Sequence, residues 1–395
     1  MKILVANLGS TSFKYRLFDM ADERVLARGG VERIGSPESR CFMEVGGKKT
    51  ESVLSAKDHA VAVRLCLKHL TESGCLANAQ ELSAIGFKAV HAQGLTGVHR
   101  VDDKVLAAME AYNDVAPAHN PCYVTAMRLL AKELPEIPLV AAFETGFHDT
   151  IPPENRLYAI PTEWIEKHGI KRWGFHGASH RYIAQRTAKL MGNPNARRII
   201  SCHLGGSSSL CAILSGQSFA NSLGMSPQSG IPHNNRVGDF DVFALPVIMR
   251  ATGKTLEQVL DILATRSGLL GLCGHNDLRD IEADIAKDDD HLPSHHAFGV
   301  FINSICHYLG AYLLLLRGAD AIVFTGGIGE NSAMARNAVC SYLGWLGIHL
   351  DDTKNQSAKG EMRIDAPNSR TQIWIMPTNE ELIVARQSRD CLQGK

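Results

Sequence analysis

The sequence has no excess of charge of either sign, because 41 Lys and Arg residues balance 41 Asp and Glu residues. A neutral chain lacks the broad electrostatic attraction that nucleic acids and anionic membranes exert on basic proteins. A long hydrophobic run is also missing: the longest apolar stretch, residues 308–316, has about half of the ~20 residues that a membrane span needs. We therefore expect neither a nucleic acid nor a membrane as a partner, and small molecules become the favoured ligands.

Secretion signals and paired cysteine motifs are absent as well. The chain is apolar only as far as Ala6 before Asn7 interrupts it, too short for the central segment of a signal peptide. The ten cysteines are scattered, without a C-x-x-C pair or a short secreted framework. This pattern predicts free buried thiols and a cytoplasmic protein.

The length of 395 residues favours two domains, since single cores usually stop growing at ~250–300 residues. Residues 2–8 and 13–20 read as two strands joined by a Gly/Ser/Thr turn, and residues 198–214 repeat this pattern. The offset is 196, which places His203 on Asn7 and Gly205 on Gly9. Residues 84–87 and 321–324 form a second, weaker repeat, each a short apolar strand followed by small residues. We expect two copies of one unit with a cleft between them.

Helical periodicity alternates with these strands and predicts an α/β protein whose sheets are covered by helices. Several prolines punctuate the chain near residue 150, where we place the boundary between the halves. The helices expected from apolar residues at three-to-four spacing cover residues 101–111, 123–133, 180–191, 256–265, 297–316 and 333–346.

Glycine-rich turns follow three of the expected strands, at residues 8–12, 204–208 and 324–332. Backbone N–H groups converge in such turns and bind phosphate, so three of them predict a nucleotide site. Other motifs fail on spacing. Residues 253–255 lack the upstream glycine of a P-loop, because Ile248 occupies that position, and residues 327–332 lack the βαβ unit of a dinucleotide-binding fold. His176 and His180 have the i,i+4 spacing of zinc ligands, but no third ligand is evident.

Seven motifs together resemble the acetate and propionate kinase family, within the sugar kinase, heat-shock-protein and actin fold group. The resemblance runs from Lys2 to Arg386. The motifs stand in family order at residues 7–15 (NLGSTSFKY), 116–121 (APAHNP), 174–180 (GFHGASH), 202–205 (CHLG), 267–271 (SGLLG), 324–332 (FTGGIGENS) and 377–382 (PTNEEL).

The resemblance implies an α/β fold of two duplicated ribonuclease H-like domains, the actin-like ATPase fold, with the active site in the cleft. It implies an N-terminal domain of residues 1–150, which segment 381–395 joins, and a C-terminal nucleotide-binding and dimerisation domain of residues 151–380. A homodimer and closure of the domains during the reaction are expected on the same ground.

The activity implied is reversible, direct phosphoryl transfer from ATP, with Mg²⁺ or Mn²⁺, to a short-chain carboxylate such as acetate or propionate. A carboxylate acceptor needs no base to remove a proton, so positioning and charge shielding suffice. The resemblance assigns catalysis to Glu144, Arg236, His176 and His119, and the metal to Asn7 and Glu380. It assigns substrate binding to Lys88, Val90, Ala118, Phe175 and Pro227. It assigns the nucleotide to Ser10, Ser12, Lys14, His203, Gly205, Gly206, Ser207, Gly327, Ile328, Gly329, Glu330 and Asn331.

Departures from the family pattern fall at functional positions. Lys88 and Glu144 stand where the family has Arg and Asp, Ala92-Gln93 replaces its usual pair of glycines, and Gly206-Ser207 replaces its Asn-Gly. Lysine keeps the charge of arginine but loses its planar bidentate grip. The leucine that usually precedes the first histidine is Ala118 here, which opens space and predicts a preference for propionate or a larger acid over acetate.

These departures leave two alternatives to a carboxylate kinase of the usual kind. One is a kinase of the same fold with a different carboxylate acceptor or phosphoryl donor. The other is a non-catalytic nucleotide-binding homologue, in which Lys88 and Glu144 mark lost chemistry. A lapsed site has no physical reason to keep five converging polar groups, so such a loss is disfavoured by the joint presence of Arg236, His176, His119, Asn7 and Glu380.

Overall fold

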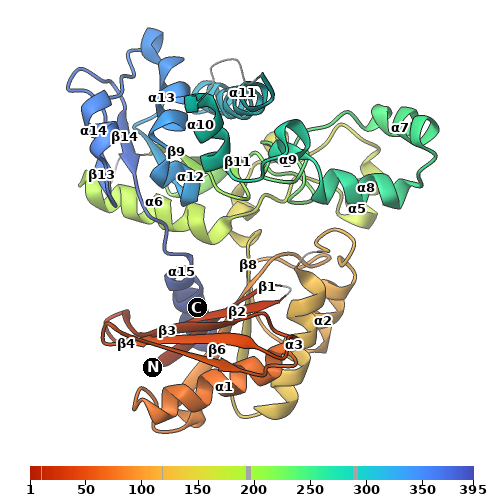
Figure 1. The fold of residues 1–395 in the computed structure, drawn as a ribbon, viewed down its shortest axis with the longest axis vertical. Helices are drawn as coiled ribbons and strands as arrows, with labels where there is room; N and C mark the ends of the chain where they lie inside the picture. Colours follow the sequence, from red (N-terminus) through yellow and green to blue (C-terminus); the bar gives the residue numbers. More distant parts are fainter. Residues whose placement is uncertain (10, 118, 193–196, 288–291) are drawn as a thin grey trace. The chain divides into compact units, whose positions relative to one another are not determined.

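The computed structural model describes residues 1–9, 11–117, 119–192, 197–287 and 292–395. The chain divides into two compact units (Figure 1). The first unit consists of Met1–Asp149 with the C-terminal segment Asn379–Lys395, and the second unit is Thr150–Thr378. Ser10 and Ala118, to which the sequence analysis assigns nucleotide and substrate binding, lie outside the described residues.

The first unit is built on an eight-stranded sheet of order β5-β4-β3-β2-β1-β6-β8-β7. β1 pairs in parallel with β6, and β6 with β8, whereas the remaining pairs are antiparallel. The strands are β1 (Lys2–Gly9), β2 (Ser12–Asp19), β3 (Arg24–Glu32), β4 (Ser39–Val45), β5 (Lys48–Leu54), β6 (Leu82–Ala89), β7 (Val98–Arg100) and β8 (Leu139–Phe143).

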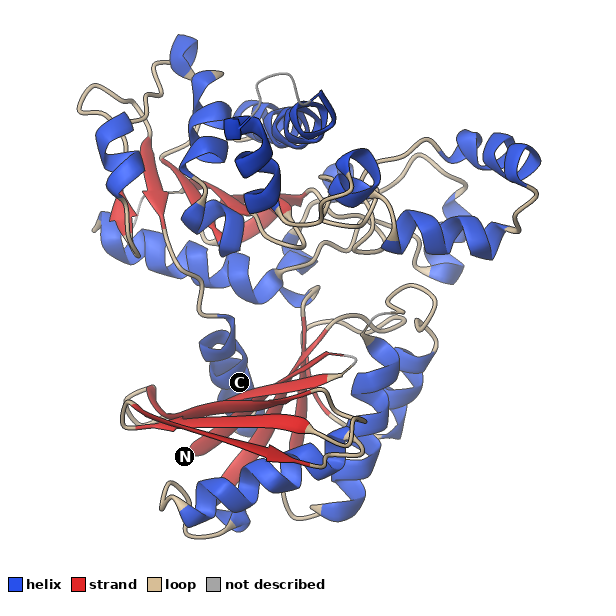
Figure 2. Cartoon of the chain, viewed as in Figure 1, coloured by secondary structure: helices blue, strands red, loops and turns tan. Residues whose placement is uncertain are grey.

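Helices cover both faces of this sheet (Figure 2). Because side chains alternate along a strand, Leu4 of β1 packs into the core beside α1 and α3, whereas Ile3 and Val5 pack with Val384 of α15. The C-terminal helix α15 therefore belongs to the first unit. The helical segments are α1 (His59–Glu72), η1 (Ala79–Glu81), α2 (Asp103–Glu110), α3 (Asn120–Glu133), η2 (Gly146–Thr150, at the boundary) and α15 (Glu380–Leu392).

The second unit contains a six-stranded sheet of order β11-β10-β9-β12-β14-β13. Its strands are β9 (Arg198–His203), β10 (Ser209–Leu214), β11 (Gln217–Asn221), β12 (Ala321–Thr325), β13 (Met362–Arg363) and β14 (Gln372–Ile375). Its helical segments are α4 (Pro153–Arg156), α5 (Thr162–His168), α6 (Gly177–Met191), η3 (Val242–Ala244), α7 (Leu245–Thr252), α8 (Leu256–Thr265), α9 (Gly268–Cys273), α10 (Leu278–Lys287), α11 (Leu292–Leu315), α12 (Gly326–Asn331), α13 (Ala333–Ser341), η4 (Gly344–Leu346) and α14 (Asp352–Ser357).

The two sheets share one topology. The orders β3-β2-β1-β6-β8 and β11-β10-β9-β12-β14 both consist of three antiparallel strands followed by two parallel ones. The strands that the sequence analysis paired by their offset, β1 with β9 and β6 with β12, occupy equivalent places. The prediction of a duplicated α/β architecture is confirmed.

The sequence-based elements differ from the structure in several places. The glycine-rich turn after β12 folds into the short helix α12, and the helix expected over residues 333–346 ends at Ser341. The helices expected from apolar spacing do not include α1, α4, α5, α7, α9, α10, α14 or α15. Most of the apolar run at 308–316 lies in α11, a helix of 24 residues. An 18-residue window of this helix has a mean hydropathy of 1.5, so by length and composition alone it could cross a membrane. Phe301, Ile305 and Leu309 of this helix lie in the core of the second unit, a common reason for such a composition.

Candidate active site

Polar side chains gather where three neighbouring parallel strands of the first unit end. Asn7 lies near the end of β1 and Lys88 near the end of β6, while Glu144 directly follows β8. The backbone N–H of Glu144 donates to the carbonyl of Ala89 at 2.8 Å, which fixes it beside the end of β6. The carboxyl ends of parallel strands meet at one edge, the usual ligand site of open α/β sheets. We call this the first edge.

Lys88 and Glu380 form a close, largely buried ion pair at the first edge. Lys88 Nζ donates to Glu380 Oε2 at 2.6 Å, and the two side chains are 19% and 15% exposed. Burial opposes the charge of the lysine, but the carboxylates of Glu380 and Glu144 outweigh it and raise the Lys88 pKa above its ordinary value. Lys88 therefore remains a cation at neutral pH.

Tyr123 of α3 holds the end of β1 in place. Its hydroxyl accepts a hydrogen bond from the Leu8 N–H at 3.1 Å and donates to Asn7 Oδ1 at 3.3 Å. Burial raises the pKa of this phenol, so it stays a donor. The sequence analysis placed Tyr123 only in a helix, because its partner lies 116 residues away and no local spacing reveals the contact.

The other residues that the sequence assigns to this unit lie on nearby elements. Lys14 is exposed and stands opposite Asn7 in the register of β1 and β2. Ser12 begins β2, Val90 follows β6, and His119 is the N-cap residue of α3.

The oxygen atoms of the first edge fit a magnesium site of a particular kind. Within the described ranges, no cluster of three His, Cys, Asp or Glu side chains could hold a metal alone. Mg²⁺, however, usually keeps several waters and takes one or two carboxylates together with substrate phosphates. The carboxylates of Glu144 and Glu380 and the amide oxygen of Asn7 supply that chemistry.

Histidine and serine side chains form a hydrogen-bonded network in the second unit. Ser209 Oγ lies 2.8 Å from His176 Nδ1 and 2.8 Å from His180 Nε2, and His180 Nδ1 lies 2.8 Å from Ser201 Oγ. The His176 ring stacks on that of His203, with centroids 4.3 Å apart. These contacts set the orientation of the imidazole of His176.

The backbone of His176 is itself unusual. This residue precedes α6 with φ 56°, in the left-handed region that costs a non-glycine residue free energy. The neighbouring Phe175 is buried, and its carbonyl accepts from Asn221 Nδ2 at 3.3 Å. Strain of this kind persists where the surrounding structure enforces it, and here the stacking and the Ser209 contact do so.

The loop that carries Arg236 is fixed by the N-terminus of α9. The N–H groups of Ser267, Leu269 and Leu270 donate to the carbonyls of residues 235, 233 and 234. Gly268 has φ +61°, and a Cβ there would lie 2.1 Å from the His233 carbonyl. This explains the SGLLG motif as the support of the Arg236 loop.

Arg236 itself lies partly buried at the end of that loop. Its Nη1 donates to the Pro227 carbonyl at 2.9 Å. Burial lowers the pKa of the guanidinium, which nevertheless stays charged because its ordinary pKa is so high. The contact with Pro227 constrains the direction of the side chain.

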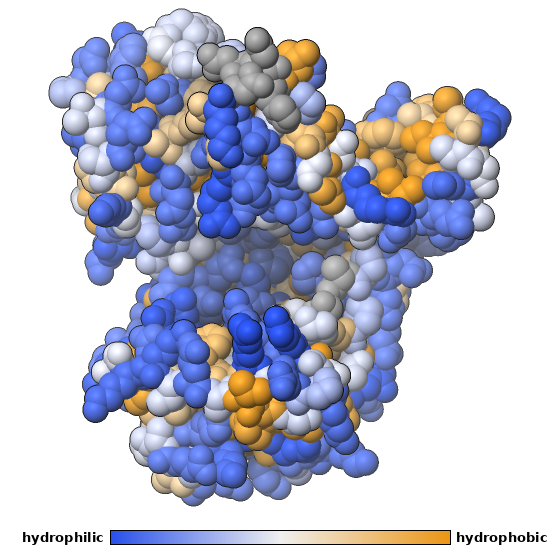
Figure 3. Space-filling view, in the orientation of Figure 1, coloured by the Kyte–Doolittle hydropathy of each residue, from blue (hydrophilic) through white to orange (hydrophobic). Residues whose placement is uncertain are grey.

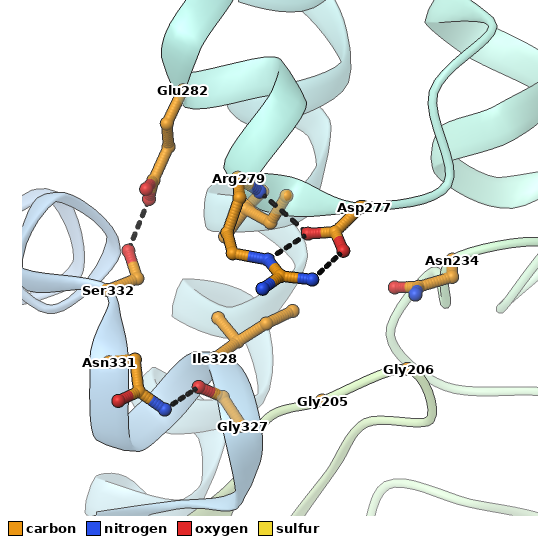
Figure 4. A pocket seen from close by; sticks show the side chains of 11 residues that line it. Gly205, Gly206, Asn234, Asp277, Arg279, Glu282, Gly327, Ile328, Asn331 and Ser332 are labelled. Carbon is orange, nitrogen blue, oxygen red and sulfur yellow. Dashed lines mark hydrogen bonds and ion pairs between the residues drawn. The ribbon is translucent and has the colours of Figure 1, made fainter.

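A cavity of about 540 Å³ opens between the glycine turns of the second unit (Figure 4). Gly205 and Gly206 line one side and Gly327, Ile328 and Asn331 another. Asn331 Nδ2 donates to the Gly327 carbonyl at 2.8 Å and closes the first turn of α12. Cavities of this size commonly hold small ligands and cofactors.

Four residues of the second unit that the nucleotide prediction names do not line this cavity. His203 stacks on His176, and a Cβ on Gly329 would lie 3.3 Å from the backbone of Phe324. Glu330 Oε1 accepts from the Gly326 N–H, so this carboxylate caps its own helix. Ser207 is the fourth, although it lies directly after Gly206 in the chain.

The sequence analysis missed one wall of the cavity. Asp277, Leu278, Arg279 and Glu282, at the start of α10, line it together with Asn234 and Ser332. Arg279 pairs with Asp277 at 2.5 Å and lowers the Asp277 pKa to about 2, and Ser332 hydrogen-bonds Glu282. This wall contains no glycine-rich turn that would mark a phosphate site in the sequence. The only local signal is the pair of Asp277 and Arg279 at the start of an amphipathic helix.

Comparisons with known proteins identify the family of the chain. The model of the acetokinase family matches residues 2–386. The chain is 41% identical over 390 residues to an acetate kinase of Bacillus cytotoxicus, covering 98% of this chain and 97% of the relative.

Solved structures give the same result. An acetate kinase of Porphyromonas gingivalis is 35% identical, with a TM-score of 0.88 and coverage of 99% of each chain. A propionate kinase of Francisella tularensis is 32% identical, with a TM-score of 0.90 and coverage of 98% of each chain. The chain belongs to the acetokinase family and is a phosphotransferase with a carboxyl group as acceptor.

Proposed function

We propose that this enzyme transfers the γ-phosphoryl group of ATP directly to a short-chain carboxylate and catalyses the reverse reaction. The cavity between the glycine turns supports this assignment most strongly, because backbone N–H groups suit phosphates and its volume suits a nucleotide. We assign ATP and ADP to the cavity. Gly205, Gly206, Gly327 and Ile328 lie against the nucleotide, and Asp277 and Arg279 form its polar wall.

We propose that three side chains bind the oxygens of the transferred phosphoryl group: one arginine and two histidines. Arg236 binds the acceptor and the phosphoryl oxygens, and its contact with Pro227 limits its motion. His176, oriented through Ser209, and His119 donate to the equatorial oxygens. Such donors stabilise the charge spread over these oxygens in the transition state.

We assign Mg²⁺ or Mn²⁺ to Asn7, Glu380 and Glu144 at the first edge. When bound, the cation neutralises negative charge on the phosphates. Lys88 holds Glu380 in place through their ion pair and supplies a second cation for the acceptor. The first phosphate turn, with Ser10, Ser12 and Lys14, stays a prediction for the nucleotide.

The acid preferred is propionate or a larger one, with Val90, Phe175 and Pro227 as further apolar lining. The preference rests on the small side chain of Ala118, and one methylene supplies no more than about 1–3 kcal/mol of discrimination. An optimum at acetate would contradict it.

A hydroxylamine trap for acyl phosphate, with ATP, Mg²⁺ and acetate, propionate or butyrate, tests both proposals through kcat/KM. We expect hydroxamate and ADP in equal amounts. No hydroxamate with any acid, while ATP still binds, would establish a non-catalytic homologue. Hydroxamate only with bulkier or hydroxylated acids, or only with another phosphoryl donor, would establish a kinase with a different specificity.

We also propose that the protein is a cytoplasmic homodimer that pairs through α7 and α8. Figure 3 shows apolar residues gathered over these helices, on the right of the second unit. Val242, Phe243 and Val247 are 64%, 84% and 56% exposed, and Leu256 and Leu260 are 41% and 48% exposed. Exposed apolar groups in this density mark interaction sites. Light scattering should give twice the mass of 43.0 kDa, and Phe243→Glu should shift it toward the monomer.

A further inference from the structure

A cluster of two cysteines and a histidine lies in the first unit, between β4 and α1. Cys66 and His69 are three residues apart on α1 and therefore share one side of the helix. Cys41 of β4 faces them, with its Sγ 3.7 Å from His69 Nδ1. Ser52 of β5 stands opposite Cys41 in the strand register. None of these residues takes part in the proposed transfer.

The two thiols have different surroundings. Cys41 and His69 line a surface cavity of about 330 Å³, which Cys66 does not line. Both cysteines are core residues, with Cys41 3% and Cys66 1% exposed. The hydrogen bond from Cys66, assisted by His69 and Ser52, lowers the pKa of Cys41 to about 6. Burial raises the pKa of Cys66 well above its ordinary value. At neutral pH, Cys41 is a thiolate and Cys66 a thiol.

We propose that Cys41 and Cys66 form a dithiol site that hydrogen peroxide oxidises to a disulfide. The thiolate of Cys41 attacks one oxygen of the peroxide, so that the O–O bond breaks and Cys41 sulfenic acid and hydroxide form. The Cys66 sulfur then attacks the sulfenic sulfur, forming the S–S bond. Hydroxide leaves and takes the Cys66 proton as water. One thiolate and one thiol are thereby oxidised, and one peroxide is reduced to one hydroxide and one water.

The histidine contact and the cavity distinguish this site from ordinary buried cysteines. Cys75, Cys122, Cys273, Cys306 and Cys391 are all more exposed than Cys41. Exposure alone would make those thiols react first, whereas thiolate character favours Cys41. Burial raises the pKa of Cys122 and of Cys306, the latter to about 11, which holds both as unreactive thiols.

The test treats the reduced full-length protein with limiting hydrogen peroxide, blocks the remaining thiols with iodoacetamide and maps the peptides by mass spectrometry. We expect a peptide linked through Cys41 and Cys66, two hydrogens lighter than its reduced parts, as the first oxidised product. Oxidation of Cys75 or Cys391 while Cys41 is still alkylated in full would overturn the proposal.

Two variants and a control separate the steps. In Cys66→Ser, dimedone should label Cys41, and in Cys41→Ser, Cys66 should stay reduced. Cys75→Ser, a change at a more exposed cysteine of the same unit, should leave the linked peptide unchanged. Thermal unfolding verifies that each variant is folded. If Cys41→Ser does not fold, the dimedone result for Cys66→Ser alone tests the proposal. Absence of dimedone label on folded Cys66→Ser would overturn the proposal.

Discussion

The two sheets have the same strand order but carry different chemistry where their parallel strands end. The first edge is charged, with Lys88 between the carboxylates of Glu380 and Glu144. At the corresponding places of the second sheet, His203 ends β9, Thr325 ends β12, and glycines follow both strands. A repeated backbone thus fixes where functional groups stand, and residue type decides what they do.

The difference suits the two halves of a phosphoryl transfer. Carboxylates beside a lysine can bind a cation and still admit an anionic acceptor. N–H and O–H donors of the second unit can face phosphates, beside the paired Asp277 and Arg279 of the cavity wall. His176 and His180 of the second unit contact serine hydroxyls. The following variants test this division, from the largest expected effect to the smallest.

Lys88→Met should destabilise the first unit most. It leaves the carboxylates of Glu380 and Glu144 buried without their cation, a change that costs about 3–5 kcal/mol in comparable pairs. Urea unfolding of the variant measures this loss. Lys88→Arg, which keeps the charge, is the matched control and should recover most of the stability. A loss below about 1 kcal/mol for Lys88→Met would show that water already screens the pair.

Arg236→Ala should lower kcat by about 100- to 1000-fold, the range seen when a donor to a developing negative charge is removed. Calorimetric titration with ADP should give an unchanged Kd, because Arg236 does not line the cavity. A variant that keeps more than a tenth of the kcat of the wild-type enzyme would refute the role assigned to this residue.

Gly268→Ala should disturb the Arg236 loop without touching substrate. The added Cβ would overlap the His233 carbonyl, and φ +61° is unfavourable for alanine, so we expect a loss of about 1–3 kcal/mol together with lower kcat. Gly299→Ala in α11 is the control, since nothing lies within 4 Å of its Cβ position. Equal thermal stability of the two variants would argue against the support role of the SGLLG motif.

Ser209→Ala should lower kcat about tenfold with little change in KM, because His176 and His180 both lose a hydrogen bond. Ser201→Ala removes only the contact with His180 and should have a smaller effect. Steady-state kinetics of both variants decide. If Ser201→Ala is the more damaging, Ser209 does not orient His176.

Glu144→Asp should have the smallest effect, because the carboxylate is retained and only one methylene is lost. We expect kcat/KM for acetate to be unchanged or raised. Complete inactivation would show instead that the first edge has been rebuilt around the longer side chain.

Short-range sequence patterns predicted the architecture of the protein more fully than the arrangement of its candidate active site. The strand–turn–strand repeat and the weaker repeat in β6 and β12 lie in short segments, so their offset revealed the duplicated fold. The pairing of Lys88 with Glu380 joins residues 292 positions apart, and Tyr123 reaches Asn7 across the core of the first unit. The cavity wall at Asp277 and Arg279 consists of side chains at a helix start, where no turn chemistry marks a ligand. Tertiary packing, which spacing does not encode, brings these groups together.

Hydrogen exchange with and without ADP tests most directly that the second unit holds the nucleotide. We predict that ADP slows exchange in the peptides covering residues 204–208, 277–282 and 326–332, which surround the cavity. Unchanged exchange in all three segments at saturating ADP, with protection confined to the turn at residues 8–12, would contradict the division of labour between the two units.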